Sequence, residues 1–224
     1  MSLFRINPNE PFQGPHQHIS PVEYGAPPTR AKAAMLMVHG RGATARGIIA
    51  LADEFAQPDF FYTAPQAQGH TWYPYSFLAP KEKNQPGISS GLQAIYDLLE
   101  SIIKSGIPRE KIILLGFSQG ACLASEFLAR HPQKLGGLVA FSGGLIGPEI
   151  NQKDYSGEMH HTPVFLGCSD IDSHIPKERV DETESIFQKL GAVVDKRIYK
   201  GMAHTINEDE IKAVRAMMAK LVQD

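Results

Sequence analysis

The sequence predicts an α/β protein with a mostly parallel central sheet and helices on both faces. Short apolar runs, such as residues 33–38 and 112–115, lack polar alternation and are typical of strands that are buried on both faces. Segments with apolar residues at helical spacing separate these runs over most of the chain. Because no repeat, low-complexity tract or internal linker interrupts this order, we expect a single domain over residues 1–224.

The composition is that of an ordinary globular chain, and it argues against several classes of protein. The formal net charge is −2 and no cluster of Lys and Arg stands out, so we expect no nucleic-acid partner. The longest apolar run, residues 33–38, is too short to cross a bilayer, and no signal-peptide core follows residues 1–5. We therefore expect a cytoplasmic protein with no membrane span, in which Cys122 and Cys168 are reduced thiols.

The N-terminal part of the chain is rich in proline. Six prolines in residues 1–31 argue against a helix and predict an extended segment, with an extended stretch or an edge hairpin around residues 18–24. His16 and His18 have an alternate spacing that hints at a metal, but no further ligands accompany them. We expect both histidine side chains to be solvated and no metal to be bound.

The remaining segments alternate between strand and helix. A helix is expected over about residues 44–57 and should stop at Pro58. Apolar residues at helical spacing predict another helix over residues 88–103. Asn207, with Glu210 three residues on, is a capping box that starts a terminal helix. The expected strands are residues 33–38, 60–64, 111–117, 138–141, 163–166 and 193–199, and further helices are expected over residues 118–130 and 176–190.

A long loop, residues 66–86, places several aromatic side chains among polar ones. Loops of this length are uncommon in compact domains and often form lids or pocket walls. The alternative is that the aromatic residues only plug the top of the core. Of the four aromatic residues we expect Trp72 to bind substrate; the others are Tyr73, Tyr75 and Phe77.

Residues 116–120 read Gly-Phe-Ser-Gln-Gly and lie between an apolar strand and a helix. In this context Gly-x-Ser-x-Gly predicts a sharp, strained turn that exposes the serine hydroxyl at the carboxyl edge of the sheet. The motif alone also occurs as a tight turn without chemistry, but both of its flanks are those of a nucleophile elbow. We therefore expect Ser118 to be a nucleophile.

A serine nucleophile needs a base, and the base needs an acid that holds its tautomer. On a fold of this class the chain order is Ser, then Asp or Glu, then His, with acid and base after late strands. His204 follows the last expected strand and is the predicted base. The acid is open at this point, because Asp170 and Asp172 lie in the same loop behind the preceding strand.

Two backbone amides are expected to stabilise the oxyanion. Residues 39–43 read His-Gly-Arg-Gly-Ala directly after a buried strand, and their glycines allow close approach to a ligand. In a serine hydrolase this loop supplies one N–H and the residue after the nucleophile supplies the other. We assign these roles to the Arg41 and Gln119 amides; the alternative for the loop is a glycine-rich turn without a ligand.

Several motifs together resemble the phospholipase/carboxylesterase family of α/β-hydrolases, which includes bacterial carboxylesterases and acyl-protein thioesterases. The resemblance implies the α/β-hydrolase fold, a Ser–Asp–His triad and hydrolysis of carboxylic esters or thioesters. It further implies small-molecule substrates, no metal and no organic cofactor, and it leaves a homodimer open. The matching motifs are His39-Gly40-x-Gly42, Ala64-Pro65 with Trp72 beyond it, Gly116-Phe117-Ser118-Gln119-Gly120-Ala121, Phe141-Ser142-Gly143 and Gly201-x-x-His204.

The sequence departs from the family pattern at two places. The family acid usually lies in Gly-x-x-Asp-x-x-Val-Pro, whereas here two extra residues separate the two halves of that pattern. Asp170 matches the first half and Asp172 the second; we choose Asp172, because Ile-Pro marks where the loop enters its helix. Arg41 stands where thioesterase-type relatives carry an apolar residue, but an oxyanion donor needs only its amide.

The expected function is hydrolysis of esters or thioesters with small to medium acyl chains through an acyl-enzyme. One alternative is a catalytically silent binding protein, and an intact set of Ser118, Asp172 and His204 argues against it. Another is a lactone or dienelactone hydrolase, in which the nucleophile is commonly Cys. A peptidase, or a metallohydrolase built on His160 and His161, has less support in the sequence.

Overall fold

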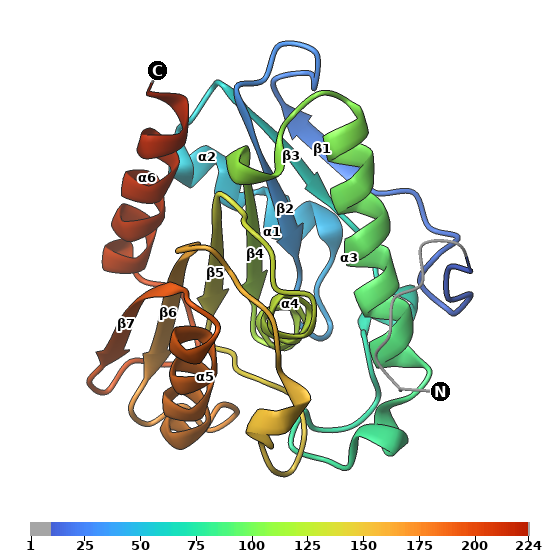
Figure 1. The fold of residues 1–224 in the computed structure, drawn as a ribbon, viewed down its shortest axis with the longest axis vertical. Coiled ribbons are helices and arrows are strands. Elements are labelled where there is room, and N and C mark those ends of the chain that lie inside the picture. Colours follow the sequence, from blue (N-terminus) through green and yellow to red (C-terminus); the bar gives the residue numbers. More distant parts are fainter. Residues whose placement is uncertain (1–9, 224) are drawn as a thin grey trace.

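The computed structural model describes residues 10–223, whose strands form a single seven-stranded sheet (Figure 1). The strand order is β1-β3-β2-β4-β5-β6-β7, and neighbouring strands are parallel except for β1, which runs antiparallel to β3. The strands are β1 (Val22–Gly25), β2 (Ala33–Val38), β3 (Phe60–Ala64), β4 (Ile112–Phe117), β5 (Gly137–Phe141), β6 (Pro163–Ser169) and β7 (Val193–Tyr199).

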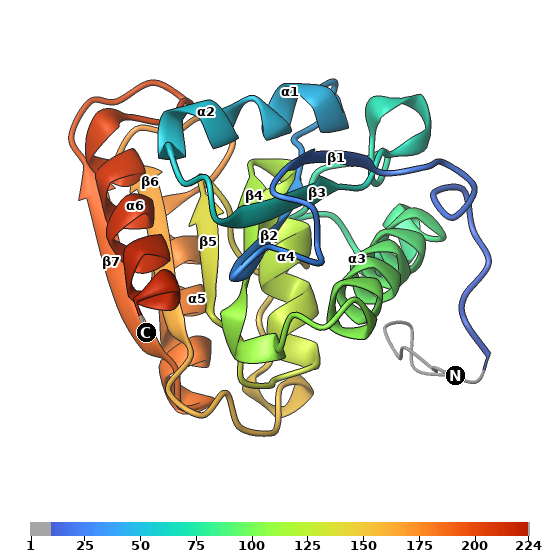
Figure 2. The same cartoon turned by 90° about the horizontal axis from the view of Figure 1, so that it is seen from above.

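Helices cover both faces of the sheet. Figure 2 shows α1, α2 and α6 on one face and α3, α4 and α5 on the other. The helices are α1 (Ala45–Ile49), α2 (Leu51–Phe55), α3 (Gly87–Lys104), α4 (Gln119–Arg130), α5 (Lys177–Lys189) and α6 (Glu208–Val222). Single 3₁₀ turns lie at Gln68–His70, Lys81–Asn84, Arg109–Lys111 and Gln152–Asp154.

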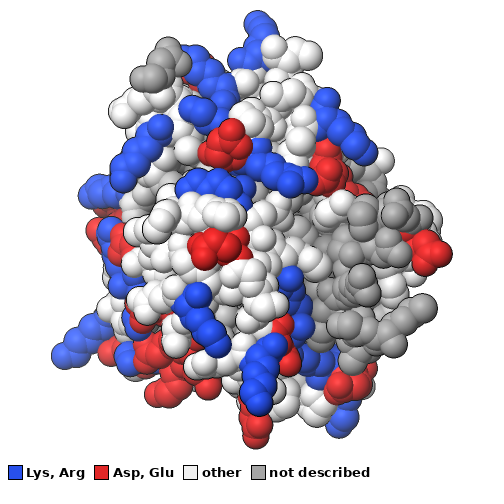
Figure 3. All heavy atoms as spheres, viewed as in Figure 1, with Lys and Arg blue, Asp and Glu red and all other residues white. Residues whose placement is uncertain are grey.

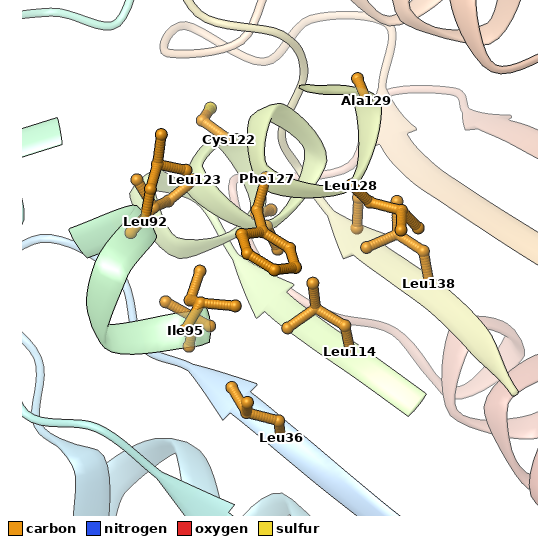
Figure 4. Packing of buried hydrophobic residues seen from close by; sticks show 14 of the residues in the cluster. Leu36, Leu92, Ile95, Leu114, Cys122, Leu123, Phe127, Leu128, Ala129 and Leu138 are labelled. Carbon is orange, nitrogen blue, oxygen red and sulfur yellow. The ribbon is translucent and has the colours of Figure 1, made fainter. Parts of the chain in front are cut away.

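Alternate residues of each central strand contribute to two separate apolar layers. On one side Leu36, Leu114 and Leu138 pack against α3 and α4, as Figure 4 shows. On the other side Met35 and Ile113 pack against α1, α2 and α6. Because both sides are covered, these strands are apolar at every position, which is why their sequences show no alternation. Each fully buried Leu or Phe side chain contributes roughly 1.5–3 kcal/mol to folding.

Two expectations about secondary structure are corrected by the structure. The helix expected over residues 44–57 is two short helices, α1 and α2, which meet at Ala50. α2 ends where Ala56 adopts a left-handed conformation with φ of 50°. Where an extended stretch or an edge hairpin was expected around residues 18–24, the chain forms the edge strand β1, which pairs with β3.

Residues 1–9 of the extended N-terminal segment lie outside the described residues. From residue 10 to β1 the chain contains no helix, in agreement with its prolines. One local expectation there is wrong: His18 is exposed, but His16 is buried against the loop that follows β3.

The parallel strands place four functional loops at one edge of the sheet. β2, β4, β6 and β7 end next to residues 39–43, Ser118, residues 170–176 and residues 200–206 respectively. In open α/β sheets the crevice at the carboxyl ends of the strands is where ligands bind. The predicted site residues therefore come from segments that are distant in sequence and meet at this edge.

Candidate active site

Ser118 lies in a strained turn between β4 and α4. Its backbone has φ of 54° and ψ of −119°, a region that residues other than glycine rarely adopt. A Cβ at Gly116 would lie 2.4 Å from the Gly120 carbonyl oxygen, and one at Gly120 would lie 2.1 Å from the Val38 carbonyl oxygen. Only glycine therefore fits on either side of Ser118, and the turn holds its hydroxyl above the sheet edge.

The structure brings Ser118, His204 and Asp172 into one hydrogen-bonded row. The distance from His204 Nε2 to Ser118 Oγ is 2.9 Å, and that from His204 Nδ1 to Asp172 Oδ2 is 2.7 Å. With Nδ1–H donating to the carboxylate, Nε2 is the ring atom that can accept the serine proton. This geometry suits a serine nucleophile with a general base.

The Asp172 carboxylate is enclosed, and hydrogen bonds satisfy both of its oxygens. Oδ1 accepts the backbone N–H groups of His174 and Ile175 at 2.8 and 3.1 Å. Burial alone would raise the pKa of Asp172, but the hydrogen bonds from His204 and the two amides outweigh it, so the pKa lies below the usual value. Asp172 therefore stays ionised at neutral pH and can stabilise a protonated imidazole.

Asp170, the other acid considered, does not contact His204. Its side chain is exposed, and Oδ1 accepts the Gly201 N–H at 2.7 Å. Asp170 thus fastens the loop that carries His204, whereas Asp172 contacts the imidazole itself. The acid beside His204 is thus Asp172, the one chosen from its position before Ile-Pro.

The Arg41 and Gln119 amides lie on the two segments that border Ser118. Gly40 is packed against the elbow, since a Cβ there would lie 3.3 Å from the Phe117 carbonyl oxygen and 3.4 Å from Ser118 Cβ. Gln119 is the first residue of α4, so its N–H has no partner inside the helix. Among residues 10–223 neither amide donates a hydrogen bond to another residue, which leaves both available to an oxyanion.

A cavity of about 430 Å³ opens beside Ser118 and His204. Pockets of this size hold small ligands. Burial raises the pKa of the Cys122 thiol, which also lines the cavity, to about 12, so this thiol stays protonated and does not compete with Ser118. The aromatic residues that line the cavity are Tyr73, Tyr75, Phe77 and Phe117.

Trp72 has a different place from the expected one. Its side chain is 0% exposed and it is absent from the cavity lining, while its neighbour Tyr73 lines the cavity. Trp72 Nε1–H donates to the His39 carbonyl at 2.8 Å, and the indole packs against the rings of His39 and His16. Trp72 thus supports the loop from beneath, and the adjacent aromatic residues form the wall.

His16 is part of the same support, which explains why it is not solvated. Its Nε2 lies 2.9 Å from the Trp72 carbonyl oxygen, and its Nδ1 accepts the Gln68 N–H at 3.1 Å. Burial lowers the pKa of His16, which keeps the ring neutral at pH 7. Within residues 10–223 no three His, Cys, Asp or Glu side chains are grouped to hold a metal ion.

Sequence reasoning missed two neighbours of His204. The His174 ring lies edge-on to His204 with the centroids 4.8 Å apart, and the Phe117 ring lies 5.1 Å away on a tilted plane. Both also line the cavity. Their only sequence signal was proximity, since His174 follows Asp172 by two residues and Phe117 precedes Ser118.

Charged side chains of both signs occur on the face of the molecule drawn in Figure 3. On the face drawn in Figure 3, basic and acidic side chains are interspersed rather than gathered by sign. No helix in the described part of the chain is long and apolar enough to cross a membrane.

The chain is similar to known proteins over most of its length. The sequence matches the phospholipase/carboxylesterase family over residues 22–222. A solved structure of a phospholipase/carboxylesterase from Dyadobacter fermentans has a TM-score of 0.88 and 41% sequence identity, and the match covers 92% of this chain and 99% of that one.

Several relatives are named acyl-protein thioesterase 1. The Kluyveromyces lactis protein is 32% identical over 213 residues, which cover 86% of this chain and 93% of the relative. The Saccharomyces cerevisiae protein is 29% identical over 211 residues, which cover 85% and 93% respectively. The similarity therefore extends over nearly the whole length of these relatives.

Proposed function

The chain belongs to the phospholipase/carboxylesterase family of hydrolases, and we propose that it cleaves carboxylic esters or thioesters through a Ser118–His204–Asp172 triad. The observation that carries the proposal is the row of hydrogen bonds from Ser118 Oγ through His204 to Asp172, with lengths of 2.9 and 2.7 Å. This row lies beside a cavity and next to two unpaired backbone amides. These are the parts that acyl transfer to serine requires.

Acylation begins when His204 Nε2 takes the Ser118 hydroxyl proton as Oγ attacks the substrate carbonyl carbon. The carbonyl π bond opens, and its electron pair forms an oxyanion held by the Arg41 and Gln119 N–H groups. Asp172 stabilises the imidazolium. When the tetrahedral intermediate collapses, His204 gives its proton to the departing alcohol or thiol, and an ester joins the acyl group to Ser118.

Deacylation repeats these steps with water. His204 takes a proton from a water molecule as the water oxygen attacks the acyl carbon, and the Arg41 and Gln119 amides hold the second oxyanion. Collapse returns the proton to Ser118 Oγ and releases a carboxylic acid. The cycle needs no group beyond this chain and water.

The cavity favours small to medium acyl chains. Its volume of about 430 Å³ is at the low end of ligand pockets, and the rings of Tyr73 and Phe77 form part of its wall. These two rings therefore take the substrate-binding role that the sequence predicted for Trp72, which does not line the cavity.

The direct test is labelling with a fluorophosphonate probe, which forms a covalent bond with an activated serine. We expect the wild type to be labelled and Ser118→Ala to remain unlabelled, with both proteins folded by circular dichroism. The same pair is then assayed on p-nitrophenyl esters and on acyl thioesters of increasing chain length. We expect turnover to be highest for short and medium acyl chains.

Absence of labelling and of turnover in folded wild type would reject the proposal and favour the alternative of a catalytically silent binding protein. Labelling that persists in Ser118→Ala would place the nucleophile elsewhere. Comparison of esters with thioesters of the same acyl chain identifies the preferred leaving group.

A further inference from the structure

The Arg41 side chain reaches across the cavity mouth to the loop that follows β3. Nη1 donates to the Pro74 carbonyl at 2.8 Å, and Nη2 donates to the Tyr75 carbonyl at 2.7 Å. The guanidinium also lies 6.0 Å from the centre of the Tyr73 ring. The planar guanidinium of arginine can donate to two adjacent acceptors at once, whereas the single ammonium group of lysine fits this pair less well.

The Gln119 side chain holds the preceding two residues of the same loop. Oε1 accepts the Trp72 N–H at 2.9 Å, and Nε2 donates to the Tyr73 carbonyl at 2.8 Å. This amide is buried, and both of its polar atoms are paired with backbone. Its hydrogen bonds are therefore sheltered from water, and leaving one unmade would cost more than at the surface.

The two residues that hold the loop are the same two whose backbone N–H groups are the proposed oxyanion donors. Between them their side chains bind four consecutive residues, Trp72 through Tyr75, by backbone groups alone. We propose that Arg41 is a positioning residue that, with Gln119, fixes the aromatic cavity wall relative to the oxyanion amides. The inference rests on the proposed function for its catalytic part.

A physical reason for this arrangement is that the Arg41 amide belongs to a glycine-flanked loop. Gly40 and Gly42 leave the backbone there freer than other residues would, and Gly42 has φ of 75°. Anchoring the Arg41 side chain at the far wall restricts the orientation of its own N–H. A displacement of about 1 Å in such a group can cost about 100-fold in rate.

The same anchor sets the width of the cavity. The segment that Arg41 holds continues into Phe77, whose ring lines the cavity with Tyr73. Releasing Pro74 and Tyr75 lets this wall move away from Ser118. Arg41 therefore affects both turnover and the preferred length of the acyl chain.

Three variants separate this role from that of a surface charge. Arg41→Leu removes both hydrogen bonds but keeps the backbone amide. Arg41→Lys keeps the charge and can reach one of the two carbonyls. Arg46→Leu is the matched control, because Arg46 is an exposed arginine on α1 that does not line the cavity.

We expect Arg41→Leu to lower kcat for p-nitrophenyl acetate by about 10- to 100-fold, with a smaller change in KM. Its ratio of long-chain to short-chain activity should rise, since the Pro74 and Tyr75 carbonyls lose their bonds to Arg41 while Gln119 and Asn84 still hold the neighbouring backbone groups. Arg41→Lys should retain more activity than Arg41→Leu, and Arg46→Leu should match the wild type.

A second measurement requires no catalysis. Trp72 is the single tryptophan of the chain and is fully buried in the held segment, so its fluorescence reports on the loop. We expect acrylamide to quench Trp72 more strongly in Arg41→Leu than in the wild type or Arg46→Leu. Thermal unfolding of each variant shows that the comparison is made on folded protein.

The outcomes distinguish the inference from the function on which it rests. Suppose that the wild type is active, that the kcat of Arg41→Leu lies within about 2-fold of that of Arg46→Leu, and that quenching of Trp72 is unchanged. This result overturns the inference. Equal activities of Arg41→Lys and Arg41→Leu would also overturn it. A wild type that is neither labelled nor active rejects the proposed function, whereas the quenching still tests whether Arg41 holds the loop.

Discussion

Around Ser118 the backbone is held by close steric contact, whereas around Asp172 and His204 it is held by hydrogen bonds. The elbow leaves no room for a Cβ at Gly116 or Gly120, where backbone atoms lie 2.4 and 2.1 Å from the ideal position. The loops after β6 and β7 are more open, and Asp170 joins them through the Gly201 N–H. Damage to the elbow should therefore appear as lost stability, and damage to the loops as lost activity with the fold retained.

The largest expected effect is on catalysis and concerns the two aspartates. Asp172→Asn should lower kcat by about 10,000-fold, because an amide favours the wrong tautomer of His204. Asp170→Asn in the same loop is the matched control and should cost less than about 10-fold, since it weakens one exposed hydrogen bond. Steady-state kinetics on one ester measure both. Similar losses in the two variants would contradict the separate positions of the carboxylates.

The next effect is on stability and concerns the elbow. Gly120→Ala places a methyl group against the Val38 carbonyl and should lower the free energy of unfolding by about 3 kcal/mol or more. Gly47→Ala at an exposed position of α1 is the control, with an expected change within about 1 kcal/mol. Urea denaturation followed by circular dichroism measures both changes. If Gly120→Ala unfolds at the wild-type urea concentration, steric contact does not hold the elbow.

A third prediction concerns Glu210, which lies behind the His204 loop at the start of α6. Burial raises the pKa of this carboxyl from 4.5 to about 7, against the hydrogen bond from the Asn207 N–H. Between these values the folded protein binds more protons there than the unfolded chain does. The free energy of unfolding should therefore fall as pH rises through this window, by about 3 kcal/mol.

Glu210→Gln removes this titration and should flatten the pH dependence of stability between pH 4.5 and 7. The control is Glu208→Gln on the same helix, since Glu208 is exposed and the hydrogen bond from Lys212 lowers its pKa. Thermal unfolding across this range compares the three proteins. If the wild type becomes more stable relative to Glu210→Gln as pH rises, the pH dependence has the opposite sign and contradicts a raised pKa of Glu210.

The smallest expected effects separate the support of the cavity from its lining. Trp72→Phe loses the hydrogen bond to His39 and some packing, so stability should fall by about 1–2 kcal/mol while the preferred acyl length stays unchanged. Phe77→Leu enlarges the lined cavity and should shift the preference toward longer chains. Chain-length profiles of the two variants test this. If the preferred acyl length shifts only in Trp72→Phe, the conclusion is that Trp72 and not Phe77 contacts the substrate.

Local sequence patterns were sufficient for most of the fold. The alternation of strand and helix, the capping box at Asn207 and the turn at Ser118 each depend on residues that are close in sequence. β2, β3 and β7 have the bounds that the patterns predict. The split between α1 and α2 was missed, because the apolar pattern runs through Ala50 without a break.

What the sequence by itself determined is the order of the elements and the kinds of side chain that follow each strand. The Ile-Pro that follows Asp172 was enough to choose it over Asp170 as the partner of His204. Only the tertiary structure decided that Tyr73 rather than Trp72 lines the cavity and that His16 lies against the loop after β3. Residues one or two positions apart have nearly the same local signals. Their directions depend on packing between segments that are distant along the chain, and that packing is a property of the whole fold.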